Sequence, residues 1–194
     1  LIAQWVNELR WSLRHGRWAW SRELLPFCFR GGVTICAGSL PNDIPYENIF
    51  FDFIFASDII EHVEDDIESL KTLRKLLKPN GKLIITVPAL MSMWSHNDEL
   101  NHHYRRYEEA ELLEKVQKSG LKIINHSFCN SYLYPIAKAV RAFKNKLKIQ
   151  SPDVSSSGNF ITNAILTKIF ASEKFYLRRN KFKVGVSLIM ACEK

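Results

Sequence analysis

The sequence predicts an α/β fold with a mostly parallel sheet and helices on both faces, on three observations within residues 51–88. Residues 51–56 and 82–87 are short apolar runs rich in aromatic and β-branched residues, typical of parallel strands buried on both faces. Residues 65–78 between them carry apolar side chains at helical spacing. Polar residues follow the first run at once, at the strand end where open α/β sheets bind ligands. A strand–helix–strand unit of this length folds as a right-handed crossover with parallel strands.

The chain before this unit is predicted to form helices and one short strand. Residues 1–16 have the spacing of an amphipathic helix, and a second apolar cluster surrounds Pro26. Residues 32–37 are β-branched and predict a strand, while residues 38–48 have the composition of a loop. The first residue is Leu1 instead of Met, which suggests a fragment of a longer protein.

The helix at residues 65–78 has recognisable ends. Asp65 and Asp66 open it, because negative charge is favoured at a helix N-terminus. Pro79-Asn80-Gly81 closes it, since proline cannot extend a helix and Asn-Gly accepts the positive φ of a tight turn. The strand at residues 82–87 follows directly and is stopped by Pro88.

The second half of the chain continues the alternation of strands and helices. Residues 89–107 are irregular and follow the carboxyl end of a strand, so we expect them above the mouth of a site. A helix is predicted at residues 108–119, with Gly120 as a left-handed cap. The remaining predictions are a strand at 121–128, two amphipathic helices at 131–148 and 160–179 and a final strand at 184–192.

Composition favours one soluble domain. The chain has 194 residues, of which 46% are hydrophobic, and no apolar run reaches the 18 residues of a membrane span. The four cysteines are widely spaced, which favours free thiols in a reducing cytoplasm. The net charge is +7, and basic residues concentrate in 138–148 and 174–183. We expect a solvated helix face first, contact with an anionic membrane surface next, and nucleic acid not at all.

Three segments in order resemble a known family. They are FDFIFASDIIEHVEDD from residue 51, LKPNGKLIITVPA from residue 77 and WSHNDELNHHYRRY from residue 94. The set resembles the second half of a class I S-adenosylmethionine-dependent methyltransferase, from about Gly32 to the C-terminus. In that family the strand order is 3-2-1-4-5-7-6, and the seventh strand is antiparallel. The resemblance therefore implies an incomplete Rossmann-like sheet in residues 32–194, with a helical insertion at about 131–180 and an antiparallel last strand.

Residues 1–31 do not match the first half of this family, which should contain a Gly-x-Gly turn after one strand and an acidic residue after the next. Gly31-Gly32 precedes a strand, so it cannot be that turn. Without the two missing strands, residues 51–56 would have a bare edge. We expect residues 32–37 to pair with that edge, or the N-terminal helices to cover it.

The resemblance implies S-adenosylmethionine as cofactor and assigns five residues to it. Ser39 and Leu40 would lie at the adenine, with Ser39 where many relatives have an aspartate. Ala56, Ser57 and Asp58 would pass the methionine end, with Asp58 facing its amino group. The alternative for Asp58 is an N-cap of the turn that follows.

Six residues are candidates for the acceptor side. His62 and His103 are predicted as catalytic because a near-neutral pKa allows proton exchange. The alternative for His62 is a structural histidine that is hydrogen-bonded to the protein. Trp94, His102, Arg106 and Tyr107 are predicted to bind substrate, or, in the case of Arg106 and Tyr107, to fasten the loop. The histidines at 96, 102 and 103 lack metal-ligand spacing, so no metal is expected.

Two main functions remain open, beside a weaker third, a peripheral membrane protein that binds through the basic C-terminal helices. The first is methyl transfer to a small or lipid-linked acceptor by a truncated enzyme located in the cytoplasm. The second is an inactive methyltransferase-like remnant that serves as a binding or scaffold domain.

Overall fold

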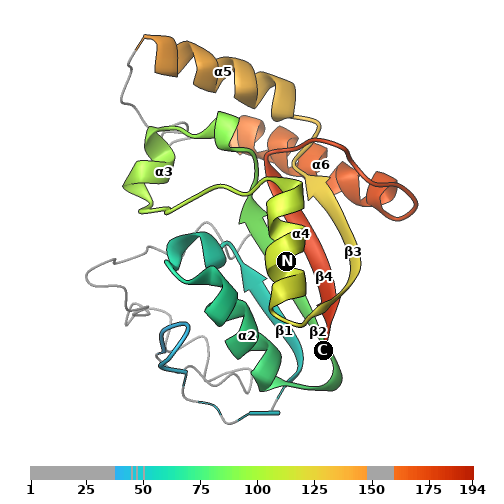
Figure 1. Ribbon diagram of the computed structural model, residues 1–194. Coiled ribbons are helices and arrows are strands. Elements are labelled where there is room, and N and C mark those ends of the chain that lie inside the picture. Colours follow the sequence, from blue (N-terminus) through green and yellow to red (C-terminus); the bar gives the residue numbers. More distant parts are fainter. Residues whose placement is uncertain (1–37, 45, 47, 50, 148–159) are drawn as a thin grey trace.

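The computed structural model describes residues 38–44, 46, 48–49, 51–147 and 160–194 (Figure 1). The helices predicted within residues 1–31 and the strand predicted at 32–37 lie outside these residues. The described elements are, in order, β1 (Phe51–Ser57), η1 (Ile60–His62), α2 (Asp66–Leu76), β2 (Leu77–Pro88), η2 (Met91–Met93), α3 (His96–Leu100), α4 (Glu109–Lys118), β3 (Lys122–Cys129), α5 (Tyr134–Lys146), α6 (Phe160–Leu177) and β4 (Ser187–Glu193).

The described strands form one sheet in the order β1-β2-β4-β3. β1 and β2 are parallel, while β4 runs antiparallel to both of its neighbours, β2 and β3. β1, β2 and β3 therefore point the same way, and only β4 is reversed. This arrangement confirms the predicted α/β sheet with an antiparallel last strand, and it equals the 4-5-7-6 half of the expected order.

One face of the sheet holds the core. α2 and α4 lie together in front of it in Figure 1. The main cluster of buried apolar side chains comes from the strands and these helices: Ala56, Leu70, Leu73, Leu83, Ile85, Val87, Leu112, Val116, Leu188, Met190 and Cys192. The apolar stripe that predicted α2 therefore packs as expected, because Leu70 and Leu73 are both buried.

β1 differs from the prediction of a strand buried on both faces. It forms an edge of the sheet within the described residues, since β2 is its only partner there. Phe53 and Phe55 point to the face opposite the core and are 53% and 45% exposed. The apolar run of β1 thus identified the strand correctly, but its second face is covered only in part by the described residues, for example by Tyr46, whose ring packs edge-on against Phe51.

The turn chemistry of the chain is confirmed at two positions. Asn80 has φ 62° and Gly120 has φ 81°, both in the left-handed region. The turn at Asn80 is shorter than expected, however, because β2 already begins at Leu77. Phe51 pairs with Leu77 and Phe53 with Lys82, so the Pro-Asn-Gly segment forms an irregularity inside the ladder.

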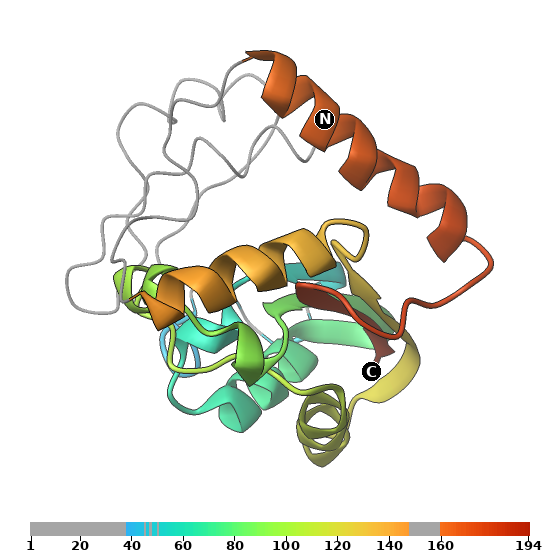
Figure 2. The ribbon, with the colours of Figure 1, turned by 90° about the horizontal axis from the view of Figure 1, so that it is seen from above.

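The two C-terminal helices differ from each other. α5 lies across the carboxyl end of the sheet, as the view from above in Figure 2 shows, and Arg141 donates to the Met93 carbonyl at 2.7 Å. α6 was predicted to be amphipathic, but its exposed apolar residues Ile165, Phe170 and Phe175 point in different directions around the helix. None of the described helices combines the length and the apolar character that crossing a membrane requires.

Candidate active site

The carboxyl ends of three strands carry a left-handed residue that is not glycine. Asp58 follows β1 with φ 49°, Leu90 follows β2 with φ 63°, and Asn130 follows β3 with φ 55°. Such residues are uncommon and cost roughly 1–2 kcal/mol each, least for Asp and Asn. Backbone strain of this kind gathers at functional sites. The strained edge is also the one where the sequence predicts ligand binding.

Asp58 is held by hydroxyl groups from two strands. Its Oδ2 accepts from Ser57 Oγ at 3.1 Å and from Thr86 Oγ1 at 3.3 Å, and its N–H donates to the Thr86 carbonyl at 2.9 Å. The alternative role as an N-cap is not observed, because η1 has Ile59 at that position without a side-chain cap. Asp58 is therefore a fixed, partly exposed carboxylate at the end of β1.

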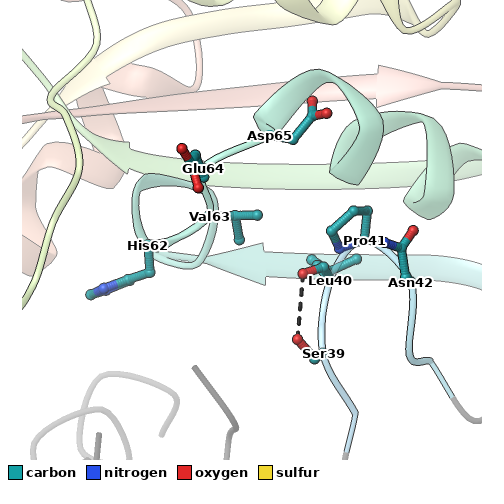
Figure 3. Close-up of a pocket in the computed structure, with 8 residues that line it drawn as sticks. All are labelled: Ser39, Leu40, Pro41, Asn42, His62, Val63, Glu64 and Asp65. Atoms are coloured by element: carbon teal, nitrogen blue, oxygen red, sulfur yellow. Dashed lines mark hydrogen bonds between the residues drawn. The ribbon is translucent and has the colours of Figure 1, made fainter. Parts of the chain in front are cut away.

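A pocket of about 380 Å³ lies beside the end of β1 (Figure 3). One wall is the loop with Ser39, Leu40, Pro41 and Asn42, and the other runs from His62 to Asp65. The loop is fixed by paired main-chain bonds between Ser39 and Asp43 and by Thr72 Oγ1, which donates to the Pro41 carbonyl at 3.0 Å. The structure thus brings the predicted adenine residues Ser39 and Leu40 next to His62.

Glu61 and His62 lie on η1, directly after Asp58. The Glu61 side chain is fully buried, and its Oε1 lies 3.9 Å from His62 Nε2. Burial and the nearby Asp58 charge raise the pKa of Glu61 well above its usual range. Burial and His103 lower the pKa of His62 to about 4. The distance allows an ion pair, but both shifts favour neutral side chains, so we describe the two residues as a neutral pair.

His103 faces His62 and is oriented by Asp98. The two imidazole rings are perpendicular, with centroids 4.6 Å apart. His103 Nδ1 lies 3.0 Å from Asp98 Oδ1, and Arg106 Nε donates to the same oxygen at 2.8 Å. Burial alone would raise the pKa of Asp98, but His103 and Arg106 outweigh it and lower that pKa to about 2. An ionised, buried Asp98 therefore fixes the ring of His103.

Arg106 and Tyr107 hold the loop to the body of the domain. Arg106 is buried and also donates to the Ala89 carbonyl at 3.1 Å. The buried Tyr107 hydroxyl donates to Asp66 Oδ2 at 2.9 Å. These contacts support the fastening role that the sequence left open as an alternative. Their prediction as substrate-binding residues gains no support, because both side chains already bind protein groups.

Asp66 is the centre of this attachment. Besides Tyr107, Arg105 Nη1 and Lys115 Nζ donate to its Oδ2 at 2.7 and 2.6 Å. Burial would raise the pKa of Asp66, but the hydrogen bonds from Lys115, Tyr107 and Arg105 lower it overall. The sequence indicated Asp66 only as helix-opening charge, and no local pattern reveals donors that follow it by about 40 residues or more.

The other predicted acceptor residues are placed less tightly. Trp94 is partly buried after η2, while His102 is exposed, with φ 56°. Both lie in the loop above the site. The main chain of His102 reaches His62, where its hydrogen bond acts to raise the pKa of His62 against the larger effect of burial. Glu61 was not predicted as a site residue from the sequence. Only the fold shows that its buried carboxylate lies near Asp58 and the two histidines.

Comparisons with known proteins agree with this architecture. A family model described as a methyltransferase domain matches residues 18–126, which is more than half of the chain. The match begins before Gly32, where the resemblance in the sequence starts. No curated protein matches the chain.

Several solved structures are similar to this chain. An S-adenosylmethionine-dependent methyltransferase from Mesorhizobium loti is 15% identical with a TM-score of 0.52, and the match covers 90% of this chain and 77% of that protein. A candidate sarcosine dimethylglycine methyltransferase from Galdieria sulphuraria is 16% identical with a TM-score of 0.53, over 87% of this chain and 63% of that one. A phosphoethanolamine N-methyltransferase from Haemonchus contortus is 19% identical with a TM-score of 0.43, over 77% and 34%.

This chain thus spans about a third of the Haemonchus enzyme and less than two thirds of the Galdieria protein. At such identities the likeness to the Mesorhizobium and Galdieria proteins concerns the fold, and it agrees with the observed strand order. The family match over more than half of the sequence shows that this chain belongs to the class I S-adenosylmethionine-dependent methyltransferase family.

Proposed function

We propose that this domain transfers a methyl group from S-adenosylmethionine to a small or lipid-linked acceptor. The observation that carries the proposal is Asp58, a carboxylate fixed in a left-handed conformation at the carboxyl end of β1, four residues before His62, which lines the pocket. Its charge suits the amino group of the methionine moiety. Methyl transfer mainly requires alignment of the acceptor with the methyl group, so a rigid site contributes directly to the rate.

On the cofactor side, we propose that Ser39 and Leu40 contact the adenine from the loop wall of the pocket. Ala56 and Ser57 would pass the methionine end, with Ala56 contributing main chain because its side chain is buried. Ser57 would act chiefly by holding Asp58, since their contact is already formed.

On the acceptor side, we propose that His62 and His103 orient the acceptor or accept its proton. Trp94 and His102 would contact the acceptor from the loop above. Arg106 and Tyr107 would act as positioning residues, because they fix the segment that carries His103.

The test is calorimetric titration with S-adenosylhomocysteine of the wild-type chain and of two matched variants. Asp58→Asn removes the proposed contact, and Asp52→Asn changes an exposed residue of the same strand, paired with Lys78 on the surface. We expect micromolar binding by wild type and Asp52→Asn, with affinity at least about tenfold weaker in Asp58→Asn.

A chain that melts cooperatively but does not bind millimolar S-adenosylhomocysteine would contradict the proposal. That outcome would favour the second function, an inactive domain that binds a partner.

We also propose that the domain contacts an anionic membrane surface through α5. Ile136, Val140, Phe143 and Leu147 follow the i, i+4, i+7, i+11 pattern of one helix face, and each is 43% to 63% exposed. Exposed Lys138 and Lys146 accompany them, and the whole chain carries +7. An apolar helix face next to basic residues suits the headgroup region of a membrane and would present a lipid-linked acceptor to the site below.

Sedimentation with vesicles tests this contact. We expect binding to phosphatidylserine vesicles that weakens with salt and is reduced in Ile136→Ser/Phe143→Ser. Ile124→Ser, at an equally exposed apolar residue of β3, is the control and should bind like wild type. Equal binding to purely zwitterionic vesicles, or no effect of the double variant, would contradict the proposal.

A cytoplasmic location is part of the same proposal. Cys129 and Cys192 are free, and burial raises the pKa of each thiol to about 12. Protonated, buried thiols of this kind are inert and suit a reducing compartment.

A further inference from the structure

We propose that Glu61, His62 and His103 form a binding site for one divalent transition-metal cation, with Zn²⁺ as the representative ion. Each residue offers one ligand atom, and the three atoms lie within 4.8 Å of one another. Two imidazoles and one carboxylate are a common donor set for such ions.

The spacing fits a cation after small side-chain movements. Ligands at the usual Zn²⁺ distance of about 2.0–2.1 Å lie roughly 3.4 Å apart in a tetrahedral site. Glu61 Oε1 and His62 Nε2 are already 3.9 Å apart. Because Glu61 and His62 are neighbours on η1, only His103 is contributed by a distant segment, the loop above the site.

Glu61 provides an independent reason to expect a cation. Its side chain is fully buried, and neither carboxylate oxygen has a hydrogen-bond partner among the described residues. A buried carboxylate without a partner is unfavourable, and proteins normally supply a cation or donors to such a group. The oxygens lie next to the two imidazoles, which are the ligands that a transition metal would share with it.

Asp98 gives His103 the orientation of a metal ligand. Its Oδ1 lies 3.0 Å from Nδ1, so a proton on Nδ1 leaves the lone pair of Nε2 available to the cluster. Carboxylates in this position fix the tautomer and ring direction of metal-binding histidines. Arg106 and Ser95 in turn hold Asp98, so the support extends into the buried part of the loop.

This set differs from the one considered in the sequence. His96 forms its own pair with Glu99, with Nδ1 and Oε2 3.1 Å apart, and His102 is exposed. The fold instead joins His103 to Glu61 and His62, which come 42 and 41 residues earlier in the chain. Three protein ligands leave a coordination position open, and because His62 also lines the pocket, an acceptor oxygen could occupy it.

The experiment measures Zn²⁺ binding to the whole chain without any methyl donor, so its result does not depend on methyl transfer. Glu61→Gln and His103→Gln remove one ligand each, and His96→Gln changes a histidine of the same loop outside the cluster. We expect one Zn²⁺ per chain for wild type and His96→Gln, with affinity at least about tenfold weaker in the other two variants.

X-ray absorption of the wild-type zinc complex keeps the test decisive if a variant does not fold. Two imidazoles with only oxygen as further ligand are expected, together with a raised melting temperature on zinc addition. Sulfur ligands, loss of binding in His96→Gln alone, or no saturable binding by the folded wild-type chain would each overturn the proposal.

Discussion

Asp66 and Glu61 are two buried carboxylates five residues apart, and the protein treats them in opposite ways. Asp66 accepts hydrogen bonds from Arg105, Tyr107 and Lys115, which join α2, the loop and α4. Glu61 accepts none on its side chain from the described residues. The satisfied carboxylate belongs to the architecture of the domain, whereas the unsatisfied one indicates where the domain is built to bind something.

Removing the charge of Asp66 should give the largest effect on stability. Asp66→Asn leaves Arg105 and Lys115 without their anion, and we expect a loss of about 2–3 kcal/mol in the free energy of unfolding. Urea denaturation measures it. Asp65→Asn is the matched control, because asparagine also accepts the Glu68 N–H as an N-cap and should be nearly neutral. Equal effects at both positions would show that Asp66 is not a structural centre.

Lowering the pH should cause part of the same loss in the free energy of unfolding, because it protonates Asp66. The pKa of Asp66 is lower in the folded protein than its ordinary value of 3.8, so its contribution is complete well above pH 3.8. Below that pH the unfolded chain binds more protons, and the contribution disappears as pH falls through the lowered pKa. Urea midpoints between pH 6 and pH 3 should therefore fall more steeply for wild type than for Asp66→Asn. Parallel curves would contradict this assignment.

Replacing Glu61 by an apolar side chain should raise the free energy of unfolding, in contrast to Asp66→Asn. Glu61→Met removes a buried carboxyl group that accepts no hydrogen bond from the described residues, and it keeps a similar volume. We therefore expect a gain of about 1 kcal/mol in the free energy of unfolding. The same urea experiment, without added metal, measures it. A clear destabilisation would mean that Glu61 is satisfied in solution, and the contrast with Asp66 would then fail.

Removing a single hydrogen-bond donor of Asp66 should give the smallest change in the free energy of unfolding. Lys115→Met removes one of three donors and should cost about 0.5–1 kcal/mol. Lys118→Met on the same helix breaks only the exposed pair with Glu114 and should change the urea midpoint by no measurable amount. Equal urea midpoints in the two variants would mean that the ion pair of Lys115 with Asp66 contributes no more to stability than an exposed surface pair.

The sequence was sufficient for the parts of the fold that depend on neighbouring residues. The stripe containing Leu70 and Leu73 identified α2, and Asn80 and Gly120 have the positive φ that their types predicted. These signals are local, because helix periodicity and turn preference act over a few residues.

The candidate site was predictable only in outline. The strand ends near Asp58 and His62 were indicated by the polar residues after β1, but the neighbours of each side chain were not. Arg106 contacts Asp98 within residues 94–107, and His103 of the same segment lies next to Glu61 on η1. No pattern in the sequence predicts these contacts, because they form only when the segment packs on η1. α6 shows the same limit, because its apolar residues predicted one face and the structure spreads them around the helix.

The left-handed conformation of Leu90 has a consequence for which amino acids can stand at this position. Leucine at φ 63° is held in that conformation by the surrounding main-chain bonds, including Leu90 N–H to the Tyr107 carbonyl at 2.9 Å, and its side chain packs against the hydrophobic core. The burial of apolar surface by this side chain therefore offsets part of the backbone strain. Glycine or asparagine in place of Leu90 would relieve the strain but lose this packing, so the two effects oppose each other in any substitution at this position.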